Sequence, residues 1–277
     1  MSKKTIVITR PSSQAKHLAD LLSADLLHHP LLDQAVPRLL NLPLLTIVPR
    51  IEPALAQQVL SALESADLAI FVSPNAIEST LQLIKRPWQE AAGTSMPVAV
   101  MGGGSLQALH NHGIGQELSP TTILMPQQND QWDSEGLWEV LQSSKSDWSG
   151  RKVLIFKGEG GRDWLADTLS AAGALVEAIA VYSRAPLELS HPAWGDLKEI
   201  DFSQSLWLLT SSEAVRYLGQ VMQQPFQGAL QKASAVCSHP AITSAAEQIG
   251  FGEVFSCEPG DAALVEATRV WLDSSAS

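Results

Sequence analysis

The sequence predicts an α/β protein built from two similar lobes, each with a parallel sheet that helices cover on both faces. Strand and helix signals alternate along all 277 residues, which is typical of parallel sheets. A chain of this length suggests two domains. A weak internal repeat supports this: Phe71 to Ile77 aligns with Leu209 to Val215, and Val98 to Gly113 resembles Ser234 to Gly250 at nearly the same offset.

Short apolar runs bounded by polar residues, Gly or Pro predict strands at residues 5–9, 67–72, 98–101, 153–156, 175–182, 206–210, 233–237 and 253–255. Apolar residues at helical spacing and N-capping residues predict helices at 14–22, 54–63 and 106–112, and others that begin at Ser73, Ser134, Asp163, Ser212, Ile242 and Ala262. The stretch from Leu42 to Val48 is extended but contains Pro43, which favours an edge or a crossing between lobes. Ser183 to Pro186 is expected to break the strand before it.

The segment from Val153 to Asp163 combines a buried strand, a glycine turn and a helix start. Glycines at 158, 160 and 161 allow backbone N–H groups to approach a ligand, and Lys157 and Arg162 add positive charge. Together with the helix N-terminus, they predict an anion site. A tight turn without a ligand explains the same residues equally well, because neither a phosphate-loop nor a dinucleotide motif is complete.

Four other turns join a predicted strand to a helix. They are Ser73-Pro74-Asn75, Gly102 to Ser105, Thr210-Ser211-Ser212 and Ser238-His239-Pro240. Their hydroxyl and N–H groups either cap the helix or contact a ligand, and the sequence leaves both interpretations open. Because open α/β sheets bind ligands at the carboxyl ends of their strands, two such edges that face each other predict a cleft.

Composition narrows the function classes. There are 18 basic and 29 acidic residues, for a net charge of −11, and the absence of a basic stripe argues against nucleic-acid binding. The two cysteines and His239 have no partner at metal-ligand spacing, so no metal is expected. No stretch has the length of a membrane span and the apolar start is too short for a signal peptide, so we expect a cytoplasmic protein. The eight scattered tryptophans are interpreted as packing residues.

Tyr182 is one of only two tyrosines and ends a predicted strand. Its phenol is either a buried packing group or a general acid for a departing group.

In their order along the chain, these motifs resemble the uroporphyrinogen-III synthase family. The matching segments cover nearly the whole chain: Ile8–Pro11, Phe71–Ala76, Gly102–Ser105, Ser134–Leu137, the run through Gly160–Arg162, Val181–Arg184, Thr210–Ser211, Ser238–Pro240 and Gly250–Phe251. The resemblance implies two flavodoxin-like, doubly wound lobes joined by two crossing strands, with the active-site cleft between them. The first lobe would comprise residues 1–38 and 186–277, and the second residues 39–185.

The resemblance also implies a reaction, the closure of hydroxymethylbilane to uroporphyrinogen III with loss of water and inversion of the last pyrrole ring. This is a cofactor-independent lyase step of heme biosynthesis, and a monomer is expected. Tyr182 stands at the position of the family's cleft tyrosine, which is the candidate to assist departure of the hydroxyl. Hydroxyls and backbone N–H groups would hold the carboxylates of the substrate. The substrate-binding residues implied are Arg10, Ser73, Asn75, Gly102, Ser105, Lys157, Gly158, Gly160, Gly161, Arg162, Thr210, Ser211, Ser212 and His239.

The chain departs from the family pattern at three positions. Lys157 replaces the more usual arginine, Ala241 stands where many relatives have arginine, and Ile242 stands where a hydroxyl is expected, with Thr243 next to it. Two other functions remain open: a non-catalytic two-lobed protein that binds a small anion, and a nucleotide-dependent transferase that uses the Gly102 turn.

Overall fold

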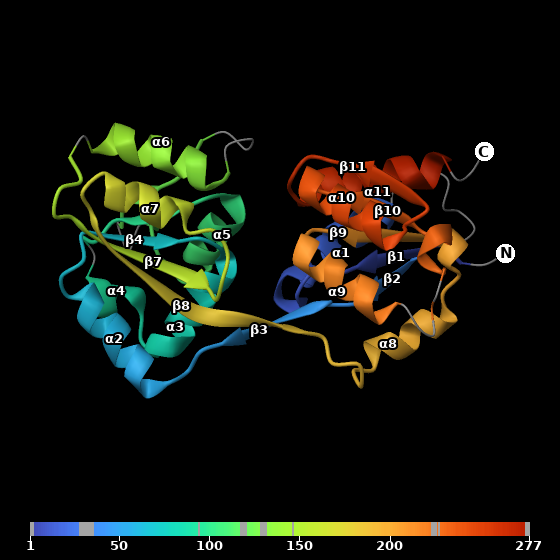
Figure 1. Cartoon of the computed structure of the whole chain (residues 1–277), viewed down its shortest axis with the longest axis horizontal. Helices are drawn as coiled ribbons and strands as arrows, with labels where there is room; N and C mark the ends of the chain where they lie inside the picture. The colour runs from blue at the N-terminus through green and yellow to red at the C-terminus, as the bar shows by residue number, and fades with distance from the viewer. Residues whose placement is uncertain are drawn as a thin grey trace. The chain divides into compact units, whose positions relative to one another are not determined.

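The computed structural model describes residues 3–27, 36–93, 95–116, 121–127, 132–145, 147–222, 226 and 228–274. The chain forms two compact units, which are Met1–Thr46 with Ala185–Ser277 (unit 1) and Ile47–Arg184 (unit 2) (Figure 1). The backbone therefore passes twice from one unit to the other. Among the described residues, none of the helices combines the length and the apolar character needed to span a bilayer.

The first boundary between the units lies later than the predicted one at residues 38 and 39. β2 (Arg38–Asn41) pairs in parallel with β1 (Thr5–Ile8), with Thr5 opposite Arg38 and Ile8 opposite Asn41. This ladder holds residues 38–41 in the sheet of unit 1, so that unit 1 extends to Thr46. The second boundary, between Arg184 and Ala185, adjoins the predicted one.

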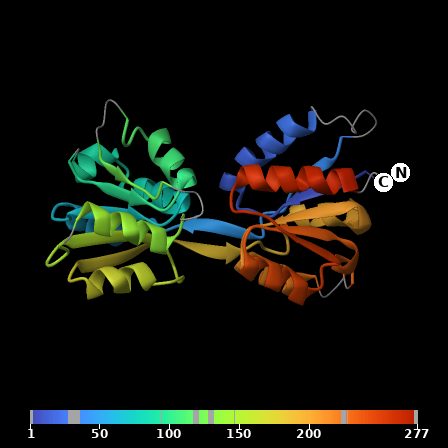
Figure 2. The same cartoon turned by 90° about the horizontal axis from the view of Figure 1, so that it is seen from above.

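Unit 1 is a five-stranded parallel sheet with the order β11-β10-β9-β1-β2. Its other strands are β9 (Ser205–Leu209), β10 (Ser234–Cys237) and β11 (Glu253–Ser256). The apolar runs of β1, β9 and β10 are buried, as expected for strands with helices on both faces. Figure 2 shows α1 (Ser12–Leu27) and α11 (Asp261–Ser274) on one face, and α9 (Ser212–Val221) and α10 (Pro240–Ile249) on the other.

Unit 2 contains a six-stranded sheet with the order β3-β8-β7-β4-β5-β6. Its strands are β3 (Leu45–Pro49), β4 (Leu68–Phe71), β5 (Val98–Val100), β6 (Ile123–Leu124), β7 (Lys152–Gly158) and β8 (Leu175–Pro186). One face carries α2 (Pro53–Leu63), α3 (Pro74–Ile84), α4 (Trp88–Ala92) and α5 (Gly103–Asn111). The other carries α6 (Ser134–Ser144) and α7 (Trp164–Ala171) (Figure 1).

The two sheets have the same spatial order, although the chain enters them at different points. The sequence repeat aligns β4 with β9 and β5 with β10. When the order of the unit 2 sheet is read from β6, the strands β6-β5-β4-β7-β8 occupy the same places as β11-β10-β9-β1-β2 of unit 1. Both sheets are doubly wound, as predicted, and unit 1 has the flavodoxin-like order 2-1-3-4-5. The repeat is thus a real structural repeat with a circular shift of the strands.

Two strands continue beyond their predicted ends. β8 runs through Ser183–Pro186, where a break was predicted, because adjacent backbone supplies hydrogen bonds: Leu187 N donates to Leu44 O (3.0 Å) and Arg50 N to Val181 O (2.9 Å). β7 continues through Gly158, which pairs with Tyr182 after a register shift. The stretch predicted as extended, from Leu42 to Val48, contains most of β3, and β3 is the edge strand of its sheet, as Pro43 favoured. Residues 42–44 separate β2 from β3.

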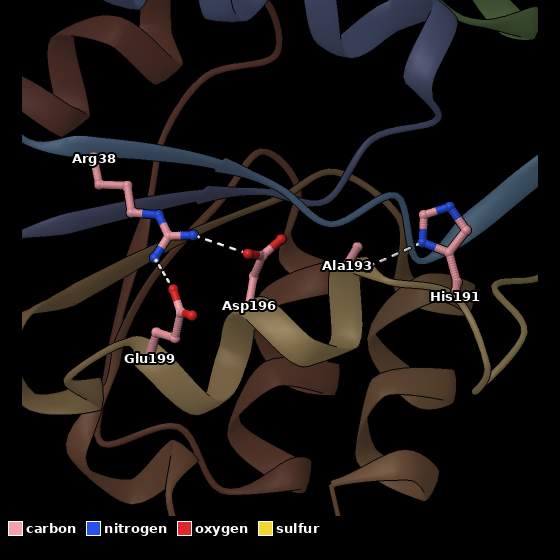
Figure 3. A network of polar contacts seen from close by, with 5 residues as sticks. All are labelled: Arg38, His191, Ala193, Asp196 and Glu199. Atoms are coloured by element: carbon pink, nitrogen blue, oxygen red, sulfur yellow. Dashed lines mark hydrogen bonds and ion pairs between the residues drawn. The ribbon is translucent and has the colours of Figure 1, made fainter.

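A polar network holds the segment that follows β8 against β2, within unit 1. Arg38 donates to Asp196 (3.0 Å) of α8 (Ala193–Asp196) and to Glu199 (3.2 Å) of η3 (Leu197–Glu199) (Figure 3). In the turn before α8, His191 Nδ1 accepts a hydrogen bond from Ala193 N at 3.2 Å. Because Arg38 begins β2, this network lies at the amino edge of the sheet, away from the predicted ligand edge, and its role is structural.

Candidate functional site

The candidate site residues of unit 2 gather where the winding of its sheet reverses. From β4 the chain proceeds to β5 on one side, whereas β7 and β8 lie on the other side. In doubly wound sheets this switch point leaves a crevice at the carboxyl ends of the strands. Ser73 follows β4 and Gly158 ends β7, so both residues lie at this point, next to the strand that carries Tyr182.

Tyr182 belongs to β8, and its buried side chain lies at the N-terminus of α3. Its side chain is 4% exposed, and its hydroxyl lies 3.1 Å from the Ser73 hydroxyl. Ser73 is also the N-cap of α3, since its oxygen accepts the N–H of Ala76 at 3.2 Å. The phenol is therefore joined by one hydroxyl to the positive end of a helix.

Gly158 provides the space in which the Tyr182 ring lies. A Cβ atom at position 158 would stand 2.7 Å from two ring carbons and 3.0 Å from the phenol oxygen. The backbone at Gly158 is not in the left-handed region, so glycine is required there for close approach and not for the turn. Glu159 N donates to Tyr182 O at 2.8 Å, which fixes the strand end against the tyrosine.

The glycine turn after β7 forms as predicted, but its two cations already have carboxylate partners. Gly160 and Gly161 take positive φ values of 70° and 89°. Lys157 forms an ion pair with Asp163, the N-cap residue of α7, and Arg162 Nη2 lies 2.5 Å from Glu135 of α6. The predicted anion site therefore has a carboxylate beside each positive group, and its backbone N–H groups are the donors that a ligand can use without displacing an ion pair.

The remaining candidates of unit 2 lie at two helix N-termini. Asn75 is buried in the first turn of α3, and Ser105 is buried in the first turn of α5, which Gly102 caps. The indole of Trp132 lies against Gly102, with three ring carbons 2.9–3.0 Å from the position of a Cβ there. Trp132 was assigned to general packing by its sequence, and nothing in its immediate neighbours indicates this contact.

Unit 1 presents an equivalent edge. Ser211 caps α9 by accepting Ala214 N at 3.3 Å, as Ser73 caps α3, so the capping interpretation of the repeat is confirmed at both positions. Thr210 and Ser212 flank it and are half-buried. His239 caps α10 through Nδ1, which accepts Ala241 N at 3.1 Å. In the neutral ring this places the proton on Nε2.

Arg10 follows β1 at the same edge and belongs to a charge cluster. It forms an ion pair with Asp261, whose other carboxylate oxygen lies 2.7 Å from His17 Nδ1. Burial opposes ionisation of Asp261, but Arg10 and His17 together outweigh it and hold the pKa of this carboxyl below its usual value. The sequence alone gave no sign of this cluster, because Asp261 is contributed by α11 at the other end of the chain.

The positions that depart from the family pattern have separate environments. Ile242 is buried among the apolar residues of unit 1 and offers no polar atom. The neighbouring Thr243 is half-buried, and its hydroxyl lies 3.0 Å from that of Ser256. Within the part of the chain that the structure describes, no three His, Cys, Asp or Glu side chains are grouped so as to hold a metal ion.

The structure thus brings the candidates together in two sets. In unit 2, Ser73, Gly158 and Tyr182 are in direct contact, with the others at adjacent strand ends: Asn75, Gly102, Ser105, Lys157, Gly160, Gly161 and Arg162. In unit 1 the strand ends carry Arg10, Thr210, Ser211, Ser212 and His239.

Two doubly wound parallel sheets, with polar residues at their carboxyl edges, define a class of two-unit α/β proteins. Comparison with known families specifies which one. The family model described as "Uroporphyrinogen-III synthase HemD" matches residues 31–266. The chain therefore belongs to the uroporphyrinogen-III synthase family.

Individual relatives agree with this membership. The uroporphyrinogen-III synthase of Escherichia coli (strain K12) is 30% identical over 186 residues, and the match spans 65% of this chain and 65% of that protein. The uroporphyrinogen-III synthetase of Helicobacter pylori 26695 is 14% identical with a TM-score of 0.59, and the alignment covers 97% of this chain and 98% of that one. A mutant uroporphyrinogen III synthase of Thermus thermophilus is also 14% identical, with a TM-score of 0.55 and coverage of 98% and 99%. These two structures establish the similarity of fold.

Proposed function

We propose that this protein is a uroporphyrinogen-III synthase, which converts hydroxymethylbilane to uroporphyrinogen III with loss of water. Its family membership supports the reaction class. The observation that carries the proposal is the buried phenol of Tyr182, 3.1 Å from the Ser73 hydroxyl at the switch point of a doubly wound sheet. The proposal includes a cytoplasmic monomer, which fractionation and sedimentation would check.

Tyr182 would act as the general acid. The hydroxyl of the substrate is a poor leaving group, and protonation lets it depart as water. Because Ser73 already accepts the Ala76 N–H, its own proton is available for the phenol oxygen, which leaves the phenol proton for the substrate. The last pyrrole ring then inverts through a spiro intermediate, in which a new bond to that ring forms before its old bridge bond breaks. At the final closure the free carbon of that ring bonds the released bridge carbon and loses a proton, and this proton restores the phenol. General acid catalysis of this kind contributes about 10²- to 10⁴-fold.

The carboxylates of the substrate would be bound mainly by hydroxyl and N–H groups. The net charge of −11 opposes an anionic ligand, so local donors must offset it. Lys157 and Arg162 already have carboxylate partners, which leaves the backbone of Gly158, Gly160 and Gly161 as the donor group of that turn. Hydrogen bonds to a charged group contribute about 1.5–3 kcal/mol each. In unit 1 the equivalent donors are Thr210, Ser211, Ser212 and His239. Arg10 would join them only if the substrate competes with its ion pair to Asp261.

The main task of the protein would be to hold one conformation of the substrate. Hydroxymethylbilane can lose its hydroxyl and cyclise spontaneously to the isomer without the inverted ring. Positioning of reacting groups can supply about 7–11 kcal/mol of a barrier, which requires neither a metal nor a nucleophile.

The test is incubation with freshly generated hydroxymethylbilane, followed by separation of the type I and type III isomers. We expect the type III isomer to predominate, and Tyr182→Phe to return the mixture toward type I. Exclusive type I product would contradict the proposal. Saturable binding of a tetrapyrrole carboxylate without turnover would instead favour a non-catalytic anion-binding protein, and a thermal shift with nucleotides would favour a transferase.

A further inference from the structure

Trp132 lies on two glycines whose lack of a side chain makes room for its indole. A Cβ on Gly102 would stand 2.9 Å from indole Cδ2, and a Cβ on Gly103 would stand 2.7 Å from indole Cη2. The ring therefore extends along the turn that opens α5. Neither glycine has a positive φ, so backbone conformation does not demand glycine at either position. What the two glycines permit is the contact with the indole.

The neighbours of Trp132 in the chain hold it in this place. The next residue, Asp133, caps α6 by accepting Gly136 N at 2.8 Å. Glu135 of the same helix pairs with Arg162 at 2.5 Å and so ties the start of α6 to the glycine turn after β7. The indole is consequently fixed beside the carboxyl edge of the sheet in unit 2.

Trp132 is not a core residue. Its side chain is 37% exposed, whereas Trp88 and Trp148 of the same unit are 1% and 6% exposed. An indole fixed against backbone on one side and open on the other offers an aromatic surface to a ligand. Flat aromatic rings bind such a surface by offset stacking, with ring centres about 4.5–7 Å apart.

We propose that Trp132 is a substrate-positioning residue that stacks against a pyrrole ring of the substrate. Gly102 and Gly103 then serve chiefly to seat the indole, instead of donating their N–H groups to a carboxylate. This inference rests on the proposed function, because the substrate of that reaction is a chain of four pyrrole rings. It adds a side chain that the residue pattern did not select.

The experiment compares steady-state kinetics and isomer ratios of Trp132→Leu, Trp132→Phe and the unaltered protein with hydroxymethylbilane. A stacking contact of this size predicts a rise in KM of about two- to tenfold for Trp132→Leu, and Trp132→Phe should recover most of it. The share of type III product should fall in the same order. Equal melting temperatures would show that the exposed position leaves the fold intact.

A matched pair of glycine variants tests the seating of the indole. Gly103→Ala places a methyl group 2.7 Å from the indole, whereas the methyl group of Gly104→Ala would be 3.6 Å from Pro74, an ordinary contact. Gly103→Ala should reproduce the KM of Trp132→Leu, and Gly104→Ala should stay near the unaltered protein. In a Trp132→Leu background Gly103→Ala should add no further change.

Three results would overturn the inference. If KM and the isomer ratio of Trp132→Leu equal those of the unaltered protein, the inference fails while the proposed function stands. The same holds if Gly103→Ala changes KM equally whether residue 132 is Trp or Leu. Exclusive type I product from the unaltered protein would overturn it together with the proposed function, so the two failures are distinguishable.

Discussion

The hydroxyl of Ser73 contacts both the phenol of Tyr182 and the backbone N–H of Ala76 in the first turn of α3. One oxygen is 3.1 Å from the tyrosine and 3.2 Å from Ala76 N. A single serine thus connects a candidate acid, contributed by β8, to a helix that follows β4. The position of the phenol depends on the packing of two strands that are far apart in the chain.

Removal of the phenol oxygen of Tyr182 should lower turnover strongly and stability only slightly. Tyr182→Phe keeps the ring that packs against Gly158 and loses one hydrogen bond, which is worth about 1 kcal/mol or less. Turnover should fall by about 10²- to 10⁴-fold, as expected when a general acid is lost. Stopped assays for turnover and thermal melting for stability check the two expectations. A rate equal to that of the unaltered protein would remove Tyr182 from the mechanism.

The structural repeat supplies a matched control for Ser73. Ser73→Ala and Ser211→Ala each remove an N-cap, which should lower stability by about 1 kcal/mol. Ser73→Ala should lose up to about 1 kcal/mol more, because it also removes the hydrogen bond to the phenol. Only Ser73→Ala also removes the partner of the phenol, so it should lower kcat beyond any change in KM, and Ser73→Thr should restore much of kcat. A loss of kcat in Ser73→Ala but not in Ser211→Ala, with both variants folded at the assay temperature, would support the positioning role. An unaltered kcat in Ser73→Ala would exclude it.

A methyl group at position 158 should disturb the tyrosine directly. Gly158→Ala places Cβ 2.7 Å from the Tyr182 ring, so either the ring or β7 must shift. Overpacking of this kind costs about 1–3 kcal/mol of unfolding free energy. Gly195→Ala is the control, because its Cβ would meet no atom within 4 Å in α8. Denaturant unfolding should show the loss for Gly158→Ala only, and equal stability of both variants would contradict the close contact.

Acid should weaken unit 1 through Asp261. The pKa of this carboxyl is lower in the folded protein than in the unfolded chain, so its ionised form stabilises the fold. This contribution is present above the unfolded pKa, about 4, and disappears as the pH falls through the lower folded pKa. Asp261→Asn should therefore melt below the unaltered protein at neutral pH, and the difference should vanish in strong acid.

The control for this pH effect is Asp20→Asn, which removes a carboxylate from an exposed i,i+4 pair with Lys16. Such pairs contribute about 0.3–0.5 kcal/mol, so the melting curve of this variant should follow the unaltered protein at every pH. A constant difference between Asp261→Asn and the unaltered protein from neutral to acid pH would show that the ion pair is not responsible.

The fold and the local parts of the site were predictable because they depend on short segments. Apolar runs located most strands, and the aligned segments at Ser73 and Ser211 located two equivalent caps. The glycine turn at residues 160–161 was also predictable, since its conformation depends on those residues themselves.

Features that depend on distant partners could not be predicted. β8 extends to Pro186 because the segment around β3 supplies its hydrogen bonds, and Arg10 is neutralised by Asp261 from the far end of the chain. Residues 38–41 join unit 1 through their register with β1, which no local signal encodes. The place of Trp132 depends on α6 and on two glycines of another turn.

The division of unit 1 between the two ends of the chain sets the order in which the protein can fold during synthesis. Unit 2 is one uninterrupted segment and is complete once Arg184 has left the ribosome. In unit 1, β1 lies between β2 and β9, so one of its edges stays unpaired until Leu209 has been made. An unpaired strand edge of this apolar composition invites pairing with another chain. The time between the synthesis of β1 and the synthesis of β9 is therefore the period in which the nascent protein is most prone to aggregate.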